Sequence, residues 1–490
     1  MMGRLSSITA LCAIALCGTN AGARAVGVKT SGGKIPITTS SPEARQQYLE
    51  GRDLFEKLRA TDAHEHYGKA LAADPDFALA HLGMANTAAT GVEFFAELGR
   101  AVALADKVSK GERLLILGAD AGARGNPARQ KQLYLELVRL HPADERGHNQ
   151  LGIYYFGLQD WASASRSFEK AIRIDPSFSQ PYNQLGYAYR FLENYGKAEE
   201  TFKKYIQLLP DDPNPYDSYA ELLMKMGRFD ESIASYEKAL KIDRNFVASY
   251  VGIGNDLMFL GRGGDARKSF ARLAGVARND GERRQAMFWT ATSYLHEGAT
   301  NKAMAEVEKM LAVAVKGNDL GAASGDHNLM GNILIEVGQA DLAAAQFKAQ
   351  LETSERSSAP ADVKEQVRRN ALFNDARVAL ARGDLPGAKH KAREYAAKVA
   401  ARKVPFEVWQ THEIAGRIAL VEKKYGVAVA ELRKANQQDP RVLYHLGLAL
   451  DAKGDRAGAK QALARAANFN ALGGNYAFVR RKAKEMLARS

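Results

Sequence analysis

The sequence predicts an all-α protein, a right-handed α-solenoid of stacked antiparallel helix pairs. Three observations lead to this fold class. Residues 145–244 repeat themselves in rows of 34. Each row has apolar residues three and four apart in both halves, which is the pattern of two helices joined by a turn. The chain of 490 residues is also long for one compact core, whereas a solenoid escapes that limit because each repeat contacts only its neighbours.

The three clearest rows begin at Glu145, Ser179 and Pro213. In every row the eighth position is small, the twenty-fourth is aromatic, and a Gly or Asn near the middle marks the expected turn. These positions hold Gly152, Gly186 and Ala220; Phe168, Phe202 and Tyr236; and Gly157, Asn194 and Gly227. Small residues let two antiparallel helices cross closely, and we expect the aromatic rings to fill the wider gaps beside each crossing.

The second row carries the most complete motif, with YNQLGYAY in its first half and YGKAEETFKKYIQLLP in its second. Pro176 and Pro210 close the first two rows. This pattern resembles the tetratricopeptide repeat (TPR) family, whose signature is a helix-turn-helix unit of about 34 residues. The resemblance implies a TPR superhelix in which stacked pairs share a continuous core. It also implies a scaffold for interactions, and the fold alone does not say which.

Rows in the same phase extend in both directions from these three. The row from Ala78 loses its register and is interpreted as a degenerate pair. Later rows lie further apart, with longer helices or loops expected at residues 316–324 and 353–363. These later rows are anchored on the small residues Ala291, Gly331, Ala376, Gly416 and Gly447. About twelve helix pairs result.

The chain is therefore expected to have four parts after its N-terminal segment. They are N-terminal TPR repeats at 43–142, a regular array at 143–280, divergent repeats at 281–474 and a C-terminal capping helix at 475–490. A terminal cap needs a polar free side. We therefore expect the cap to point its basic side chains outward, namely Arg480, Arg481, Lys482 and Lys484.

The first 25 residues have the order of a cleavable signal peptide. Arg4 precedes an apolar run from Leu5 to Cys17, and alanines at A-x-A spacing follow. The run is too short to anchor the chain across a bilayer. We expect the mature chain to begin at Arg24 or Val26, and the protein to be periplasmic or secreted.

The only cysteines, Cys12 and Cys17, lie inside this segment. A cleaved protein would therefore have no disulfide, no thiolate zinc site and no catalytic cysteine. A lipoprotein attached through Cys17 is a less favoured alternative, because Leu16 stands where such signals usually have Gly, Ala or Ser. Residues 26–42 are rich in Gly, Ser, Thr and Lys, and we expect a flexible linker or an extended arm there.

No candidate catalytic, cofactor or metal site emerges from the sequence. His64 and His66 are two residues apart, so on a helix they do not share a face. The HEIAG stretch at His412 lacks the second histidine of a zinc-protease helix. The glycines around Gly263 are followed by no Lys-Ser or Lys-Thr, which a phosphate loop requires. We therefore expect a protein that is not an enzyme.

The first helix of each pair should face the concave surface of the superhelix, as the resemblance implies. Polar residues at the concave positions are our candidates for a peptide-binding groove. They are Asn149, Gln150, Asn183, Gln184, Tyr187, Arg190, Glu221 and Asn255. Carboxamides can both donate to and accept from an extended peptide backbone. The alternative is that these residues only solvate a surface helix. The family's full Lys, Asn and Arg set for gripping a free carboxylate is not present.

The formal net charge of +12 is concentrated in the C-terminal third. Residues 361–403 have 11 basic and 5 acidic side chains, and residues 455–490 have 8 and 2. Such an excess could attract an anionic partner, or could simply be a solvated face of basic helices. We expect no nucleic-acid partner.

Together these observations predict a non-enzymatic scaffold or adaptor of the bacterial cell envelope that binds proteins or peptides in its concave groove. A second hypothesis is a membrane-attached factor that organises the envelope or polysaccharide export. A third is a cytoplasmic regulatory TPR protein, if the N-terminal segment is not a signal.

Overall fold

The computed structural model describes residues 33–489, apart from residues 58, 401 and 403. Within this part the chain forms 25 helices and no strand. The predicted signal peptide and most of the predicted linker lie outside the described residues. The chain divides into two compact units. The N-terminal unit comprises the described residues up to Leu222 together with Ala234–Phe246, and the C-terminal unit comprises Leu223–Ile233 and Val247–Ser490.

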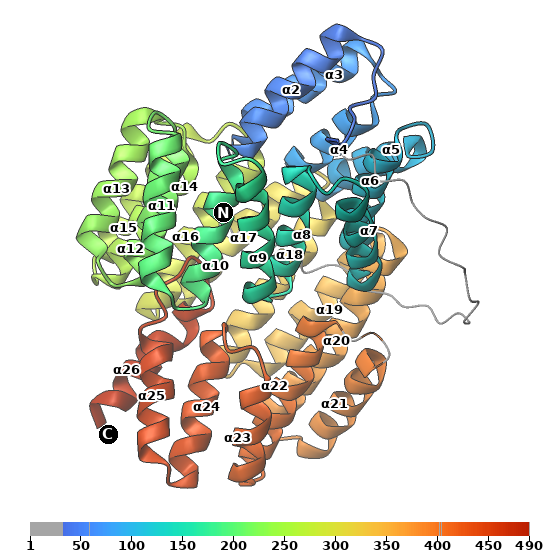
Figure 1. Ribbon diagram of the computed structural model, residues 1–490. Coiled ribbons are helices and arrows are strands. Elements are labelled where there is room, and N and C mark those ends of the chain that lie inside the picture. Colours follow the sequence, from blue (N-terminus) through green and yellow to red (C-terminus); the bar gives the residue numbers. More distant parts are fainter. Residues whose placement is uncertain (1–32, 58, 401, 403, 490) are drawn as a thin grey trace. The chain divides into compact units, whose positions relative to one another are not determined.

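The N-terminal unit is a succession of antiparallel helix pairs (Figure 1). In chain order its helices are α2 (Pro42–Glu56), α3 (Ala60–Ala73), α4 (Ala78–Thr87), α5 (Gly91–Leu104), α6 (Lys110–Ala123), α7 (Pro127–Leu140), α8 (Glu145–Gly157), α9 (Trp161–Ile174), α10 (Gln180–Phe191) and α11 (Tyr195–Leu208). The boundary between the units falls within the next pair, α12 (Pro213–Lys225) and α13 (Phe229–Ile242). The predicted rows are confirmed, because Glu145 and Pro213 are the first residues of α8 and α12, and Ser179 directly precedes α10.

The C-terminal unit continues the pairing with longer helices. They are α14 (Val247–Phe259), α15 (Gly263–Val276), α16 (Asp280–Glu297), α17 (Thr300–Lys316), α18 (Leu320–Glu336), α19 (Ala340–Arg356), α20 (Ala361–Ala381), α21 (Leu385–Ala400), α22 (Pro405–Val421), α23 (Tyr425–Lys434), α24 (Pro440–Lys453), α25 (Arg456–Ala467) and α26 (Tyr476–Arg489). The described residues thus contain twelve pairs and a final helix, as predicted. The wider spacing comes from helices such as α20, with 21 residues, and not from long loops.

At several close helix crossings a glycine lies under an aromatic ring. A methyl group built on Gly186 would lie 2.6 Å from the ring of Phe202, sixteen residues later in the same pair. The same contact recurs between Gly118 and Tyr134, Gly152 and Phe168, Gly254 and Phe270, and Gly331 and Phe347. The prediction that the rings fill gaps beside the crossing is therefore wrong. The ring lies directly on the glycine, since only a residue without a side chain leaves room for it.

The turns between paired helices also differ from the prediction. Gly157 is still helical, and the left-handed residue of that turn is Gln159, with φ of 60°. In the next pair it is Glu193, with φ of 57°, while Asn194 caps the following helix by accepting a hydrogen bond from the backbone N–H of Lys197. Gly227 does take the left-handed conformation, with φ of 77°.

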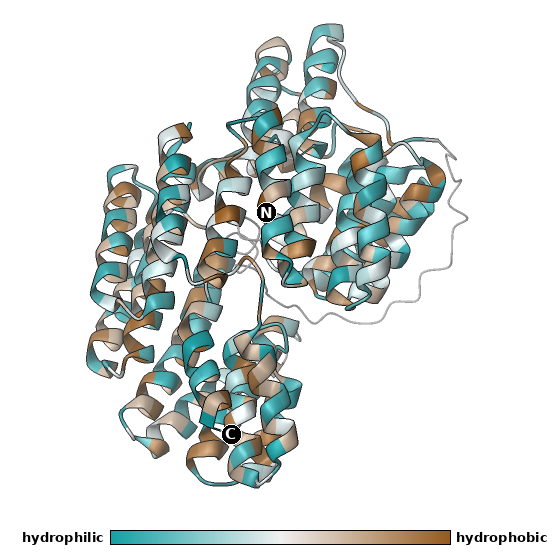
Figure 2. Cartoon of the chain, turned by 90° about the vertical axis from the view of Figure 1, so that its left-hand side faces the viewer, coloured by the Kyte–Doolittle hydropathy of each residue, from teal (hydrophilic) through white to brown (hydrophobic). Residues whose placement is uncertain are grey.

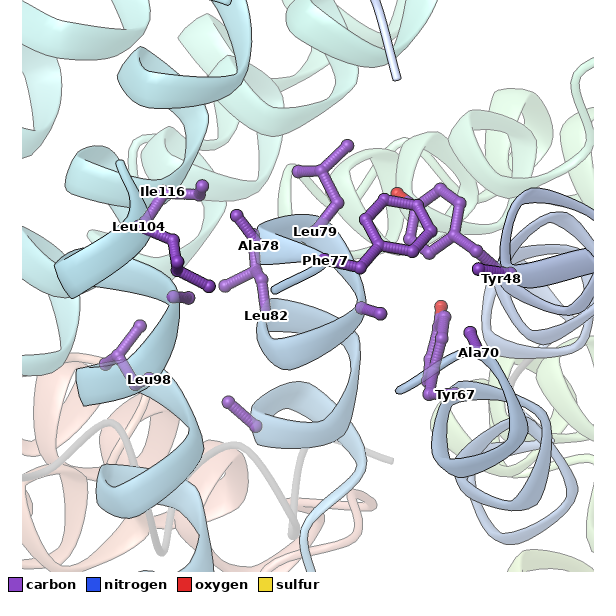
Figure 3. Close-up of a cluster of buried hydrophobic side chains, with 14 of the residues drawn as sticks. Tyr48, Tyr67, Ala70, Phe77, Ala78, Leu79, Leu82, Leu98, Leu104 and Ile116 are labelled. Atoms are coloured by element: carbon purple, nitrogen blue, oxygen red, sulfur yellow. The ribbon is translucent and has the colours of Figure 1, made fainter. Parts of the chain in front are cut away.

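The degenerate row forms a pair with a shortened first helix. Helix α4 has only 10 residues, and Thr90 caps α5 immediately after the intervening bend. The pair nevertheless belongs to a continuous core, in which Phe77 contacts Tyr48 from the preceding pair with ring centroids 5.0 Å apart (Figure 3). Leu98 and Ile116 extend the same core toward the next pair. Stacking of neighbouring pairs therefore compensates for the lost register.

Hydrophobic and hydrophilic residues alternate around most helices (Figure 2). This amphipathic pattern is what a helix needs when one side packs on neighbouring helices and the other meets water. Among the described residues no helix combines the length and the apolar character that a membrane span requires.

Residues 33–41 form an extended arm, which was one of the two alternatives expected for residues 26–42. The backbone N–H of Ile35 donates to Asp144 Oδ2 over 2.7 Å, and that of Thr38 donates to Glu112 Oε1 over 2.6 Å. The side chain of Lys34 pairs with Glu145. The arm thus runs past the N-terminal ends of α6 and α8. Hydrogen bonds from backbone amides to buried carboxylates hold it there.

Candidate peptide-binding face

The first helices α8, α10 and α12 place their polar side chains next to one another. We call the set Asn149, Gln150, Asn183, Gln184, Tyr187, Arg190 and Glu221 the polar face of the N-terminal unit. Members of neighbouring helices bond directly. The hydroxyl of Tyr187 donates to Glu221 Oε1 over 2.8 Å, and these residues lie one 34-residue row apart. Asn149 Nδ2 donates to Oε1 of Gln180 over 2.7 Å. The repeat therefore brings the predicted residues together.

Arg190 and Glu221 form a buried ion pair within this face. Nη1 of Arg190 lies 3.3 Å from Glu221 Oε2 and donates to the backbone oxygen of the same residue. The guanidinium also lies 4.8 Å from the ring centre of Tyr187 and 5.0 Å from that of Phe191. Burial, followed by the charge of Glu221, raises the pKa of Tyr187 well above its usual range, so this hydroxyl stays protonated and donates.

Most of this face is buried, although side chains that bind a peptide or solvate a surface helix, as the sequence predicted, should be accessible. Asn149 and Asn183 are each 1% exposed, and Arg190 is 3% exposed. Only Gln150 and Gln184 are half-buried. The physical reason is that adjacent first helices approach closely enough for their polar side chains to bond across the gap, as Tyr187 and Glu221 do.

Three buried polar atoms of this face have no hydrogen-bond partner in the part of the chain that the structure describes. They are Asn149 Oδ1, Asn183 Oδ1 and Arg190 Nε. Asn149 and Asn183 occupy the same position of consecutive rows, so their free carbonyl oxygens repeat with the helices. Buried polar atoms without partners are rare in native proteins because each costs free energy. The neighbouring helices cover these oxygens, so the carboxamides of this face that a bound segment could reach are those of the half-buried Gln150 and Gln184.

Asn255 belongs to the C-terminal unit and not to this face. Its Oδ1 accepts a hydrogen bond of 2.8 Å from the hydroxyl of Tyr476 on α26, and its Nδ2 donates to the backbone oxygen of Val251. Asn255 is fully buried by these contacts. The eight predicted residues therefore divide between two units, and seven of them share the polar face.

The outward basic cluster predicted on the last helix is wrong for Arg480 and Lys482. Arg480 is 3% exposed, lies 4.0 Å from the ring centre of Phe259 and donates to Asn470. Lys482 pairs with Glu336 of α18 over 3.1 Å. The sequence does contain a signal for this contact. Tyr476, Val479 and Ala483 recur along one side of the helix, and all three are buried.

Several of the remaining basic side chains in the C-terminal third also have acidic partners. Arg368 pairs with Glu355 and Glu365, and Arg382 pairs with Asp341. On the neighbouring helices, Lys389 pairs with Glu422 and Lys391 with Glu394. The positive charge that an anionic partner would meet is therefore smaller than the residue count indicates.

The histidines singled out in the sequence have ordinary protein partners. His64 hydrogen-bonds to Thr87, whereas His66 hydrogen-bonds to Gln47, so the two rings face different helices. His412 contacts Glu431 over 2.7 Å. In the described residues no three His, Cys, Asp or Glu side chains are arranged to hold a metal ion.

Family models match the chain where the helix pairs are most regular. Five models described as tetratricopeptide repeat match residues 145–178, 167–200, 214–246, 251–319 and 441–469. The fold and these matches define a helical-repeat solenoid protein that serves as a scaffold for protein interactions. The matched residues are tetratricopeptide repeats, as their sequence motifs suggested.

Solved structures with a similar arrangement of helices include two of the protein MamA. A crystal structure of MamA has 21% sequence identity, covers 34% of this chain and 91% of that chain, and gives a TM-score of 0.29. MamA residues 41 to the end, from Desulfovibrio magneticus RS-1, have 17% identity, cover 34% of this chain and 95% of that chain, and give a TM-score of 0.30. No curated protein matches the sequence.

Proposed function

We propose that this protein is a non-enzymatic scaffold of the bacterial cell envelope, and that the polar face of its N-terminal unit holds an extended segment of a partner protein. The observation that carries the proposal is the pair of glutamines Gln150 and Gln184 on the adjacent first helices α8 and α10, one row apart. Both side chains are only half-buried, so their amide groups can meet a partner while the rest of the polar face holds the helices in place.

The spacing of these groups suits an extended backbone. Neighbouring packed helices lie about 8–10 Å apart, and a strand advances about 3.3 Å per residue. An extended segment would therefore present an N–H to each successive helix about every third residue. Each such N–H could donate to the side-chain oxygen of Gln150 or Gln184, which are only half-buried.

Site-specific photo-crosslinking in the native host tests this proposal. A photoreactive amino acid is placed at Gln184 on the polar face, or at Gln207 on the second helix α11, which is exposed. We expect crosslinked proteins from position 184 only, and mass spectrometry then identifies the attached segment. Equal crosslinking from both positions would overturn the proposed face.

Affinity measurements with the identified segment give the quantitative test. The double change Gln150→Ala and Gln184→Ala should weaken binding by roughly tenfold or more, because each lost hydrogen bond costs about 1 kcal/mol. The matched control is Gln132→Ala with Gln207→Ala, two exposed glutamines on second helices of the same unit. Equal losses for the two pairs would contradict the assignment of the polar face.

The envelope setting is a separate part of the proposal. It is supported by the order of Arg4, the apolar run from Leu5 to Cys17 and the A-x-A alanines in the sequence. Mass spectrometry of protein recovered from its host should show a mature chain beginning at Arg24 or Val26. Recovery of a protein that still begins with Met1 would contradict export. This result would not bear on the proposed binding face.

A further inference from the structure

Helix α26 packs on a surface made by helices far earlier in the C-terminal unit. It contacts α24 and α25, which precede it, and also α16 (Figure 1). Tyr476 begins the helix, is fully buried, and donates from its hydroxyl to Asn255 of α14 over 2.8 Å. Its ring meets Phe259 edge-on with centroids 4.9 Å apart. An aromatic ring inserted between first helices is the kind of anchor that dominates the energy of a helix in a groove.

Charged groups extend this contact along the helix. Lys482 pairs with Glu336 at the end of α18 over 3.1 Å. Although burial acts in the opposite direction, Lys482 and the nearby cations lower the pKa of Glu336 to about 2, so this carboxylate stays ionised. The guanidinium of Arg480 lies 4.0 Å from the ring centre of Phe259 and donates to Oδ1 of Asn470. One helix therefore contacts α14, α16 and α18, all of them first helices of their pairs.

The connection to α26 is longer than the turns between most pairs. Residues 468–475 separate α25 from α26 and include Gly473 and Gly474. Glycine widens the range of backbone conformations that such a segment can adopt. Docking of α26 also buries a charged group, which costs free energy, because burial lowers the pKa of Arg480 to about 10. Beside it, Nδ1 of His296 lacks a hydrogen-bond partner among the described residues. A long connection and a costly charged contact both favour reversible docking.

We propose that the surface formed by α14, α16 and α18 is a helix-binding site, that α26 occupies it within one chain, and that it accepts α26 of a second copy of this chain. The occupant is defined by chemistry on the surface itself: Asn255 and Phe259 receive a tyrosine, and Glu336 receives a lysine six residues further on. Every contact that α26 makes within its own chain can also form with a second copy of the chain. The exchange of α26 between two copies therefore depends on the protein concentration. A tether of this length gives its own helix an effective concentration on the order of millimolar.

A labelled peptide of residues 474–490 tests the binding site. We compare the wild-type full chain with a full chain carrying Tyr476→Ala and Lys482→Glu, which weaken the tethered helix while leaving α14, α16 and α18 unchanged. The peptide should bind the variant at least tenfold more tightly than wild type, because the competing helix is released. Arg481→Glu is the control, since Arg481 lies on the same helix with its side chain 61% exposed. If the double variant binds the peptide no more tightly than the Arg481→Glu control does, the proposed binding site is wrong.

Folding of each variant is checked by circular dichroism. If the double variant does not fold, Lys482→Glu alone serves, because that side chain is 37% exposed and its loss removes one ion pair only. The single variant should bind the peptide more tightly than wild type and Arg481→Glu, and equal affinities would overturn the proposal. A peptide with alanine in place of the tyrosine should bind none of the chains.

Native mass spectrometry of the wild-type chain tests the second copy as the occupant. With rising protein concentration we expect a dimer that excess peptide dissociates and that Tyr476→Ala lowers strongly. A chain that remains monomeric at all concentrations, while the peptide still binds the released variant, would show that the site serves a helix of another protein and would overturn this choice of occupant.

Discussion

Phe202 rests on the backbone of Gly186, with its ring where a side chain at position 186 would lie. A methyl group there would come 2.6 Å from two ring carbons, which is closer than real side chains approach. Because the ring occupies the space that a side chain at position 186 would need, the close packing of α10 on α11 requires a glycine there.

The first prediction concerns this contact. Gly186→Leu should lower the free energy of unfolding of the N-terminal unit by about 1–3 kcal/mol or more, because the pair must open to admit the side chain. Gly196→Leu on the second helix of the same pair is the control, since nothing lies within 4 Å of a methyl group there. Urea unfolding followed by hydrogen exchange in α10 and α11 measures both, and equal effects would show that the crossing is not tight.

The second prediction concerns the buried ion pair of the polar face. Arg190→Ala should cost about 3–5 kcal/mol, because it leaves the Glu221 carboxylate buried without its cation. Arg173→Ala removes a cation that is 64% exposed and lies 3.8 Å from Glu169, and it should cost less than about 1 kcal/mol. Both values come from urea midpoints, and a small loss for Arg190→Ala would mean that water reaches Glu221 readily.

The third prediction concerns acid sensitivity at α26. Burial first, then Arg480 and Lys484, lower the pKa of His296 from 6.5 to about 4. In the unfolded chain His296 becomes protonated below about pH 6.5, whereas in the folded chain it becomes protonated only below about pH 4. The contribution of neutral His296 to the free energy of unfolding is therefore fully present above pH 6.5. As the pH falls to 4, this contribution decreases by about 1.4 kcal/mol per pH unit, and by about 3 kcal/mol in all.

His296→Gln should flatten this dependence between pH 6.5 and 4. The control is His390→Gln, whose side chain is 63% exposed on α21 and makes only a distant contact of 3.8 Å with Glu394. Thermal unfolding across the pH range measures the slopes. An unchanged slope for His296→Gln would mean that another group governs the acid loss.

The fourth prediction separates the extended arm from ordinary helix capping. Asp144 caps α8 by accepting from Gly147 and also accepts from the backbone N–H of Ile35, whereas Asp160 caps α9 by accepting from Ser163 alone. Asp144→Ala should therefore cost about 1 kcal/mol more than Asp160→Ala. Hydrogen exchange at Ile35 and Thr38 should rise only in the first variant. Unchanged exchange there would show that other contacts hold the arm.

The helix pairs could be predicted from sequence because their signals are local. Gly186 and Phe202 lie sixteen residues apart and recur with the row, so a pattern within one repeat contains the whole contact. The shortened α4 was harder, since only its packing on Tyr48 and Tyr67 makes it part of the core. Repetition along the chain therefore established the architecture and the number of pairs.

The exposure of the polar face could not be predicted in the same way. Whether Arg190 meets water depends on Glu221 across the gap between α10 and α12, and no pattern within one row contains that distance. The position of Arg480 depended on Phe259, more than two hundred residues earlier. Sequence identified which residues share a face, while burial followed from how closely the helices approach.

The contact between Tyr476 and Asn255 joins residues 221 positions apart. Contacts within one helix pair can form as soon as about 34 residues have left the ribosome, so each pair can assemble during synthesis. Helix α26 cannot dock until the last residues of the sequence have emerged, and it must then find a surface completed long before. The surface of α14, α16 and α18 is therefore complete during synthesis well before the helix that covers it has emerged.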